Sequence, residues 1–168
     1  LFNCIQIKDV ENYDYYYTLF VKWCINLVKM AHNTLENEYR LAGVLVLQGA
    51  QGCRKTTFVE RLMPSKQLCK CDKTLNPEKT DSIIENTKYI LVEWGELDST
   101  LKGEQAKLKQ FITSSSDEYR APYARLPEKY PRLTSYIGTV NKLDFLKDET
   151  GSRRFWIIPI KGFDFEIL

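Results

Sequence analysis

A glycine-containing loop between a buried strand and a helix constrains this chain more than any other feature. Residues 44–47 are Val-Leu-Val-Leu, a continuous run of the kind found in a strand buried on both faces. The loop 49–54 follows, and residues 55–62 have the pattern of a short helix that ends before Pro64. A strand, a glycine-containing loop and a helix in this order predict a phosphate-binding loop.

The residues of this loop suit the binding of a nucleoside triphosphate with magnesium. Backbone N–H groups of the loop and of the first helical turn would converge on the anionic phosphates. The Lys55 ammonium would add a charge between the β- and γ-phosphates, and the Thr56 hydroxyl would ligate Mg²⁺. The predicted cofactors are ATP and Mg²⁺, and the predicted binding residues are Gly49, Ala50, Gln51, Gly52, Cys53, Arg54, Lys55, Thr56 and Thr57.

Arg54 occupies the position before the lysine, where such loops ordinarily have glycine. If the backbone needs a positive φ there, arginine costs on the order of 1 kcal/mol. If φ is helical, arginine fits and its guanidinium points outward or toward phosphate. The sequence leaves both arrangements open, and it also leaves open a chance match in an ordinary strand–loop–helix unit.

A second buried strand is predicted over residues 89–92, and acidic residues follow it. Glu93 comes directly after the strand, with Glu96 and Asp98 just beyond. Parallel strands place their C-terminal ends along one edge of a sheet, where ligands bind. An ATPase needs one carboxylate there to hold Mg²⁺ and one to polarise the attacking water. Glu93 and Glu96 suit these tasks, with Glu93 joining Thr56 at the metal, although the residues do not settle which acid activates water. Taken alone, a solvated acidic turn would be the simpler interpretation.

Two further segments offer catalytic groups. The predicted strand 134–140 ends at Asn141, whose amide can orient the lytic water, although asparagine after a strand is also an ordinary turn residue. Arg153 and Arg154 precede the apolar strand 155–160, and a guanidinium supplied across a subunit boundary can stabilise transition-state charge. The alternative is a surface turn in which Asp148 or Glu149 pairs with Arg153.

Residues 114–131 are polar and contain prolines, which predicts a long surface loop or hairpin. Basic and aromatic side chains alternate in and just after it: Tyr119, Arg120, Tyr123, Arg125, Lys129, Tyr130 and Arg132. This mixture suits single-stranded DNA or a subunit interface, and a plain solvated loop is the alternative.

Composition narrows the class of protein. A net charge of +2 excludes a tail that holds nucleic acid by bulk charge. The sequence contains no run of about 18 apolar residues, so no membrane-spanning helix is predicted. Five scattered cysteines argue for a reducing cytoplasm. The pair Cys69 and Cys71 has no second pair, and His32 is the one histidine, so a four-ligand zinc site is not predicted.

Strands that alternate with helices predict an α/β sandwich with a mainly parallel sheet. Apolar residues at helical spacing over 16–35 predict a long helix whose aromatic stripe packs into the core. We expect residues 1–40 to form an N-terminal helical segment on an ATPase core of residues 41–168. The N-terminus does not have the pattern of a signal peptide. Because the chain lacks an initiator methionine, we expect it to be cut from a longer protein.

From about residue 41 to 160, four blocks of the sequence resemble the virulence-associated protein E family. These blocks are GAQGCRKTTF, LVEWGELD, DEYRAPYAR and PRLTSYIGTVNKLDFLKDETGSRRFW, and the last is the most specific. The family is similar to superfamily 3 helicases and the wider AAA+ group. Its members occur in phages, prophages and pathogenicity islands, often behind a primase-like domain.

The resemblance implies a three-layer fold with a five-stranded sheet of order 5-1-4-3-2. In chain order these strands are 44–47, 67–71, 89–92, 134–140 and 155–160. It implies an ATP-driven DNA helicase or replication-initiation motor, acting as a homo-oligomeric ring, a hexamer, on single-stranded or origin DNA beside a fused or associated primase. By motif, Lys55 and Thr56 become Walker A residues, Glu93 and Glu96 Walker B-like acids, Asn141 sensor 1, and Arg153 or Arg154 the arginine finger. Arg54 departs from the family glycine.

Two rival functions remain. A P-loop kinase would lack an arginine finger in trans and would need an acceptor pocket. A degenerate nucleotide-binding or DNA-bound scaffold would bind nucleotide without efficient hydrolysis, and Arg54 is the feature that supports it. DNA-dependent turnover would favour the helicase.

Overall fold

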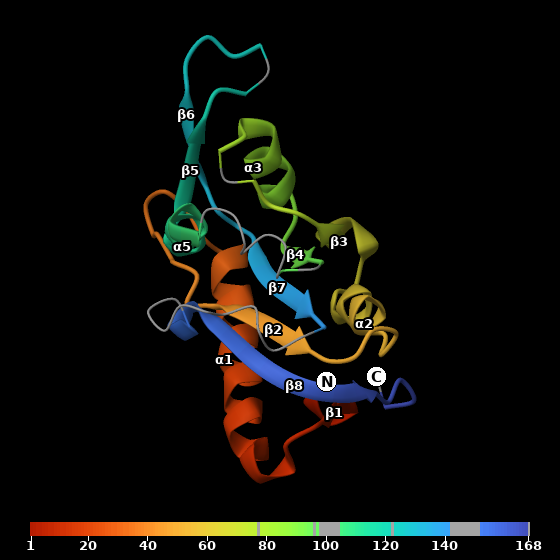
Figure 1. Cartoon of the computed structure of the whole chain (residues 1–168). Helices are drawn as coiled ribbons and strands as arrows, with labels where there is room; N and C mark the ends of the chain where they lie inside the picture. The colour runs from red at the N-terminus through yellow and green to blue at the C-terminus, as the bar shows by residue number, and fades with distance from the viewer. Residues whose placement is uncertain (77, 96, 98–104, 122, 142–151, 168) are drawn as a thin grey trace.

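The predicted phosphate-loop strand, β2 (Val44–Gln48), lies inside a six-stranded sheet of order β1-β8-β2-β7-β4-β3 (Figure 1). This computed structural model describes residues 1–76, 78–95, 97, 105–121, 123–141 and 152–167. The other strands of the sheet are β1 (Ile5–Ile7), β3 (Cys69–Lys73), β4 (Leu91–Trp94), β7 (Ser135–Val140) and β8 (Phe155–Phe163). The strands from β8 to β3 are parallel, and β1 joins β8 antiparallel.

The five predicted strands occur in the predicted order, 5-1-4-3-2, and β1 adds a sixth strand that was not predicted. Ile5 and Ile7 are buried and Gln6 is exposed, but three residues are too few for this alternation to stand out in a sequence. Strand β4 both begins and ends two residues later than predicted, at Leu91 and Trp94, so Glu93 lies inside the strand rather than after it.

Helices cover both faces of the sheet, as a three-layer α/β fold requires. Alternate residues of β2 face opposite sides: Leu45 and Leu47 belong to one core cluster, Val44 and Val46 to the other. The first cluster includes side chains of α1 (Tyr13–Ala31) and α2 (Lys55–Leu62). The second includes side chains of α5 (Gln105–Thr113), with α3 (Thr80–Thr87) packed against it. The sheet is therefore buried on both sides.

The N-terminal helix α1 spans residues 13–31 rather than the predicted 16–35. Trp23 is fully buried, and its Nε1 donates to the Tyr136 carbonyl at 2.9 Å, so this part of the aromatic stripe packs in the core as predicted. The helix ends before Asn33, whose buried amide donates to the Ser115 and Arg132 carbonyls. Residues 1–40 thus supply a strand and a helix to the same sandwich, and a division at residue 40 stays a prediction. None of the described helices is both long and apolar enough to cross a membrane.

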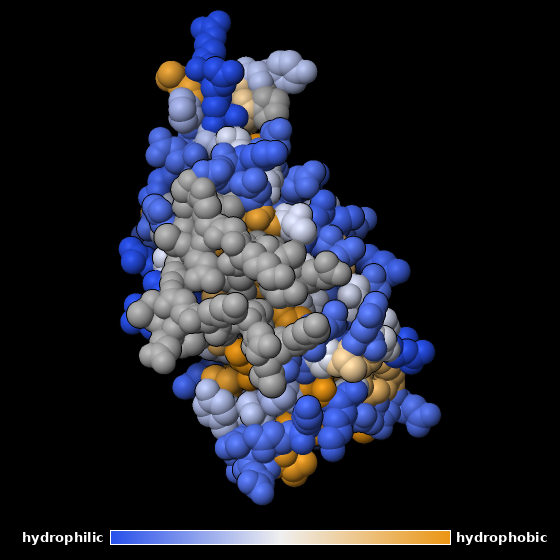
Figure 2. Space-filling model, viewed as in Figure 1, coloured by the Kyte–Doolittle hydropathy of each residue, from blue (hydrophilic) through white to orange (hydrophobic). Residues whose placement is uncertain are grey.

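The polar segment forms a hairpin, β5 (Ser116–Tyr119) paired with β6 (Glu128–Pro131), which projects from the body of the molecule (Figure 1). The Tyr119 and Tyr130 rings stack across it with centroids 4.5 Å apart. At its base, the buried Arg132 guanidinium donates to the Asp117 carboxylate and to the Phe111 carbonyl. Figure 2 shows that the projecting region presents a mostly hydrophilic surface in this view.

Candidate nucleotide-binding site

The phosphate loop begins where β2 ends between β7 and β8. The Gly49 N–H donates to the Val140 carbonyl at 3.1 Å. A Cβ atom on Gly49 would lie 2.9 Å from the Ile160 carbonyl oxygen, closer than real Cβ contacts allow. Glycine is therefore required here because strand β8 passes directly beside the loop. Gly52 has a φ of +83°, the turn that carries the chain back toward α2.

Arg54 precedes α2 with φ +66° and ψ +32°, in the left-handed region. The helical alternative for this residue is wrong, and the cost of about 1 kcal/mol applies. The Arg54 carbonyl accepts the first helical hydrogen bond from the Phe58 N–H at 3.1 Å. Its guanidinium lies 5.5 Å from the centre of the Phe165 ring, so the side chain reaches the C-terminal segment.

Lys55 is the first residue of α2, and its side chain folds back so that the ammonium contacts the phosphate loop. Lys55 Nζ donates to the carbonyls of Gly49 at 2.8 Å and Ala50 at 3.0 Å, and it contacts Cys53 Sγ at 3.7 Å. It also donates to Asn141 Oδ1 at 3.0 Å. Asn141 follows β7, the neighbour of β2, so the structure brings together the predicted lysine and the predicted amide from positions 86 residues apart.

Thr56 and Glu93 also meet. The Thr56 hydroxyl donates to Glu93 Oε1 at 2.9 Å. Glu93 is fully buried, an expensive position for a carboxylate, and the hydroxyl compensates one of its oxygens. Its other oxygen, Oε2, accepts a long hydrogen bond from the Asp72 N–H at 3.4 Å. A hydroxyl and a carboxylate at this spacing are oxygen ligands of the kind that Mg²⁺ prefers.

A pocket of about 320 Å³ is lined by Lys55, Thr56 and Asn141 among others, whereas the buried Glu93 is not a lining residue and reaches the pocket through Thr56. Its lining includes the predicted residues Gln51, Gly52, Arg54, Lys55, Thr56, Thr57 and Asn141. The remaining predicted loop residues, Gly49, Ala50 and Cys53, contact the Lys55 ammonium from below. The pocket thus combines a helix N-terminus, a lysine and oxygen ligands in one place.

Asp72 also lines the pocket, and the sequence did not single it out. Asp72 lies inside β3 where the register with β4 shifts, between Lys70 and Lys73, and it has a φ of +54°. A Cβ atom on Gly95 would collide with Asp72 Oδ1, so glycine at 95 makes room for this carboxylate. The signal was its place near the C-terminal end of a predicted strand, the same criterion that identified Glu93.

A thiol lies close to the buried acid. The pKa of the Cys71 thiol is raised above its ordinary value, first by its hydrogen bond with Cys69, then by burial, and also by the Glu93 carboxylate. Cys71 belongs to β3, the strand beside β4. Strand β3 therefore places Cys71 close to Glu93 and Asp72 in the lining of the nucleotide pocket.

The two predicted arginines lie elsewhere. Arg153 and Arg154 form a 3₁₀ turn before β8, and Phe155 pairs with Val44 at the start of β2. The phosphate loop follows the other end of β2, about 13 Å away at 3.3 Å per residue. Arg153 is exposed, and the buried Nε of Arg154 has no hydrogen-bond partner in the described part of the chain. Glu96, Asp98, Asp148 and Glu149 lie outside the described residues, so the roles predicted for these acids remain predictions.

Two of the basic residues near the hairpin have structural partners. Arg132 is buried against Asp117 and over the Phe111 ring, so it is not part of an exposed basic surface. Lys129 Nζ pairs with Glu38 Oε1 at 2.5 Å. Arg120, Arg125 and Tyr123 remain exposed, and they define the surface that a ligand could contact.

Comparison with known proteins agrees with this architecture. The structure is similar to three structures of the NrS-1 C-terminal region, with TM-scores of 0.55, 0.54 and 0.52 at 17%, 16% and 18% identity. The alignments cover 83%, 87% and 84% of this chain but 33%, 35% and 33% of the other chains, so this chain spans about a third of their length. At this identity the likeness establishes the fold alone. No curated protein sequence matches the chain.

The sequence itself matches one family model over residues 2–168, and that model describes the virulence-associated protein E-like domain. The match confirms the resemblance seen in the four sequence blocks and extends it to the N-terminal segment that carries β1 and α1. The chain belongs to the family of virulence-associated protein E-like domains.

Proposed function

We propose that this chain is the ATP-binding and ATP-hydrolysing motor domain of a helicase-type DNA replication protein from a phage or mobile element. One observation carries the proposal. Lys55 of α2 bonds to Asn141, which follows β7, and Thr56 of α2 bonds to Glu93 in β4. Groups from the C-terminal ends of the neighbouring strands β2, β7 and β4 are therefore joined at one site. These are groups that bind ATP and its metal ion and orient water in phosphoryl transfer from ATP to water.

The residues present fit a magnesium-bound nucleotide. The Lys55 ammonium would contact the β- and γ-phosphates, to which the N–H groups at the start of α2 also point. Thr56 and Glu93 would hold Mg²⁺, which neutralises phosphate charge when bound. The Asn141 amide would orient the attacking water, and Glu96 would polarise it. Because Glu93 bonds directly to Thr56, we assign the metal role to Glu93 and the water-activating role to Glu96.

The position of the two arginines favours a ring. Arg153 and Arg154 precede β8 at the edge of the sheet opposite the phosphate loop. The arginine turn and the phosphate loop lie at opposite ends of β2, about 13 Å apart, and an arginine side chain spans roughly half of that distance. They would therefore act on the nucleotide of a neighbouring subunit rather than on their own, as an arginine finger does in a homo-oligomeric ring such as a hexamer.

The hairpin is the proposed contact with DNA. Arg120 and Arg125 are exposed on it, with Tyr123 fully exposed near its tip. Cationic side chains beside an aromatic ring suit the backbone and bases of single-stranded or origin DNA. We place this motor in the cytoplasm of a bacterial or phage-infected cell, in a longer protein that carries or recruits a primase.

The experiment that tests the proposal is ATP binding and DNA-stimulated ATP hydrolysis by the full-length parent protein and its Lys55→Ala variant. Lys55 supplies charge-assisted hydrogen bonds, so its loss should weaken ATP binding at least about tenfold and remove most turnover. Lys22→Ala, which removes an exposed lysine of α1, serves as the matched control. Unchanged ATP affinity in Lys55→Ala by calorimetry would refute the site. Phosphate transfer to an acceptor other than water would favour the kinase, and ATP binding without hydrolysis would favour the scaffold.

The ring is tested separately by mixing two inactive variants. Lys55→Ala subunits lack a working phosphate loop, and subunits with both Arg153→Ala and Arg154→Ala lack the finger. Each finger variant should bind ATP but lose about 10³-fold or more in hydrolysis. In mixed oligomers some interfaces pair an intact loop with an intact finger, so activity should return. No recovery in oligomers shown to be mixed would mean that these arginines only brace their own turn.

A further inference from the structure

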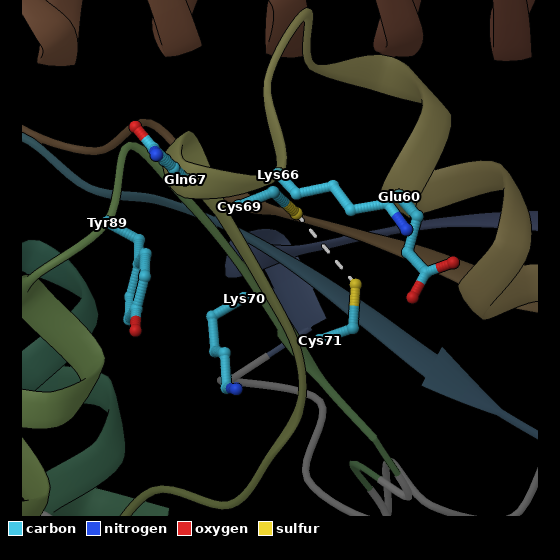
Figure 3. A pocket seen from close by; sticks show the side chains of 7 residues that line it. All are labelled: Glu60, Lys66, Gln67, Cys69, Lys70, Cys71 and Tyr89. Carbon is cyan, nitrogen blue, oxygen red and sulfur yellow. Dashed lines mark hydrogen bonds between the residues drawn. The ribbon is translucent and has the colours of Figure 1, made fainter.

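Two thiols of strand β3, Cys69 and Cys71, line a second pocket that is distinct from the nucleotide pocket. Cys69 and Cys71 are two residues apart on an extended strand, so their side chains lie on one face. Their sulfur atoms are 3.8 Å apart, and Figure 3 shows the two side chains pointing toward each other. They line a pocket of about 520 Å³ together with Glu60, Lys66, Gln67, Lys70 and Tyr89. The predicted ATPase chemistry uses neither of them.

The surroundings of the pair favour a reaction between the two thiols over metal binding. In the described part of the chain, no group of three or more histidine, cysteine or acidic side chains is arranged to hold a metal ion. Cys71 is half-exposed, and the pocket gives a small molecule access to both sulfur atoms. Lys66 and Lys70 add positive charge at the pocket, which attracts anionic reagents.

The strand can accommodate a bond between these sulfurs. Residues two apart on an extended strand have Cα atoms about 6.6 Å apart, near the upper end of the range of about 4.4–6.8 Å that disulfides span. Among the residues that the structure describes, β3 is the edge strand of the sheet and pairs with β4 alone. Its register with β4 shifts between Lys70 and Lys73, where Asp72 has a positive φ. A disulfide also requires Cβ atoms about 3.5–4.5 Å apart, closer than an extended strand holds residues i and i+2, so β3 must bend at this irregular position for the sulfurs to bond.

We propose that Cys69 and Cys71 form a reversible intrastrand disulfide with a low-molecular-weight disulfide such as oxidised glutathione as the oxidant. One cysteine sulfur attacks the oxidant, forms a mixed disulfide and releases one thiol. The second cysteine sulfur attacks the first, forms the Cys69–Cys71 bond and releases the second thiol. Two protein thiols are oxidised and one disulfide is reduced to two thiols, so protons and electrons balance. Such bonds in cytosolic proteins are transient and redox-sensing.

The thiol pair is connected to the nucleotide site through one residue. Asp72 follows Cys71, and its N–H donates to Glu93 Oε2, while Glu93 Oε1 accepts from Thr56. Closing the disulfide moves Cys71 and therefore the Asp72 N–H, so the buried Glu93 carboxylate loses its position. This second step rests on the proposed function, because it predicts that oxidation weakens Mg²⁺–ATP binding. The loss of one hydrogen bond corresponds to a weakening of up to about tenfold.

The disulfide itself can be tested without nucleotide. Trypsin cleaves after Lys66, Lys70 and Lys73, so it separates Cys69 and Cys71 into peptides 67–70 and 71–73. After treatment of the native chain with oxidised glutathione, mass spectrometry should find these peptides joined, or an uncut 67–73 peptide two hydrogen atoms lighter. Dithiothreitol should reverse either change. Free or separately glutathionylated 67–70 and 71–73 peptides, in a sample where other cysteines have reacted, would overturn the proposal.

Variants then separate the disulfide from its effect on the site. Cys71→Ser should leave only a mixed disulfide on Cys69, whereas Cys24→Ser, which removes a half-exposed thiol of α1, should still form the linked peptides. Calorimetry compares Mg²⁺–ATP affinity of the oxidised and reduced protein, with the Cys69→Ser, Cys71→Ser double variant as the baseline. Equal affinities in a protein that binds Mg²⁺–ATP and carries the disulfide would overturn the coupling. Failure of the reduced protein to bind Mg²⁺–ATP would instead refute the nucleotide site and leave the disulfide standing.

Discussion

Replacing Arg54 by glycine and, separately, by alanine tests whether the loop truly holds a left-handed residue before its lysine. The two variants remove the same guanidinium, which lies over the Phe165 ring at 5.5 Å. They differ in the backbone, because alanine keeps a Cβ atom at φ +66° and glycine does not. The difference between them therefore isolates the strain.

The magnitudes follow from the contacts. An exposed cation–π contact contributes about 0.5–1 kcal/mol, and Arg61 lies over the same ring at 4.8 Å in either variant. Alanine should therefore destabilise the protein by about 0.5–1 kcal/mol. Glycine relieves about 1–2 kcal/mol of left-handed strain but restores about 0.4–1 kcal/mol of freedom to the unfolded chain. The glycine variant should be more stable than the alanine variant by about 0.5–1 kcal/mol.

Urea unfolding at equilibrium measures both variants against the natural chain. For a domain of this size, 1 kcal/mol also corresponds to roughly 2–4 °C in Tm. In a helical conformation the order would reverse, because alanine is then preferred to glycine by about 1 kcal/mol. An alanine variant equal to or more stable than the glycine variant would therefore refute the left-handed assignment. A large gain in ATPase activity with glycine would show that the natural loop is impaired as an enzyme.

Two further predictions concern the acids and the hairpin. Glu96→Gln should preserve ATP binding and lower hydrolysis by roughly a hundredfold or more. Glu93→Gln should weaken Mg²⁺-dependent ATP binding. If calorimetry and turnover show the opposite pattern, the roles of the two acids are exchanged. Arg120→Ala and Arg125→Ala should each weaken single-stranded DNA binding and reduce the slope of log affinity against log salt by about one, and unchanged slopes would exclude the hairpin from the DNA contact.

The fold could be predicted because its signals are local. Strands β2 and β7 are apolar runs long enough to recognise, and the resemblance supplied their order. Strand β1 could not be predicted in this way, since its three residues form a strand only because β8 extends to Phe163 and offers them a partner. Residues distant in the chain decide that pairing, and no pattern within 5–7 contains it.

The site divides along the same line. Lys55 and Thr56 stand in one short motif, and Glu93 follows from the rule that ligands bind at the ends of parallel strands. Asp72 depends on a register shift at the sheet edge, which the sequence does not display. Arg132 was grouped with the exposed basic residues because its buried partner Asp117 lies 15 residues away on the opposite strand of the hairpin. Sequence patterns thus identify side chains whose position follows from a local motif, and they miss side chains whose position depends on pairing with residues far away in the chain.

Backbone strain connects the proposed sites. Among the described residues, the non-glycine positions with positive φ are Arg54, Asp72 and Tyr123. The first two line the nucleotide pocket, and the third is exposed on the proposed DNA-binding hairpin. Glycine would remove on the order of 1 kcal/mol of strain at each, so the side chains are present despite a local cost. A guanidinium, a carboxylate and a phenol are the groups that bind phosphate, metal-bound water and nucleobases. The cost in backbone strain therefore falls at positions where binding chemistry needs a side chain. At the neighbouring Gly95 the opposite holds, because the missing Cβ leaves room for the Asp72 carboxylate.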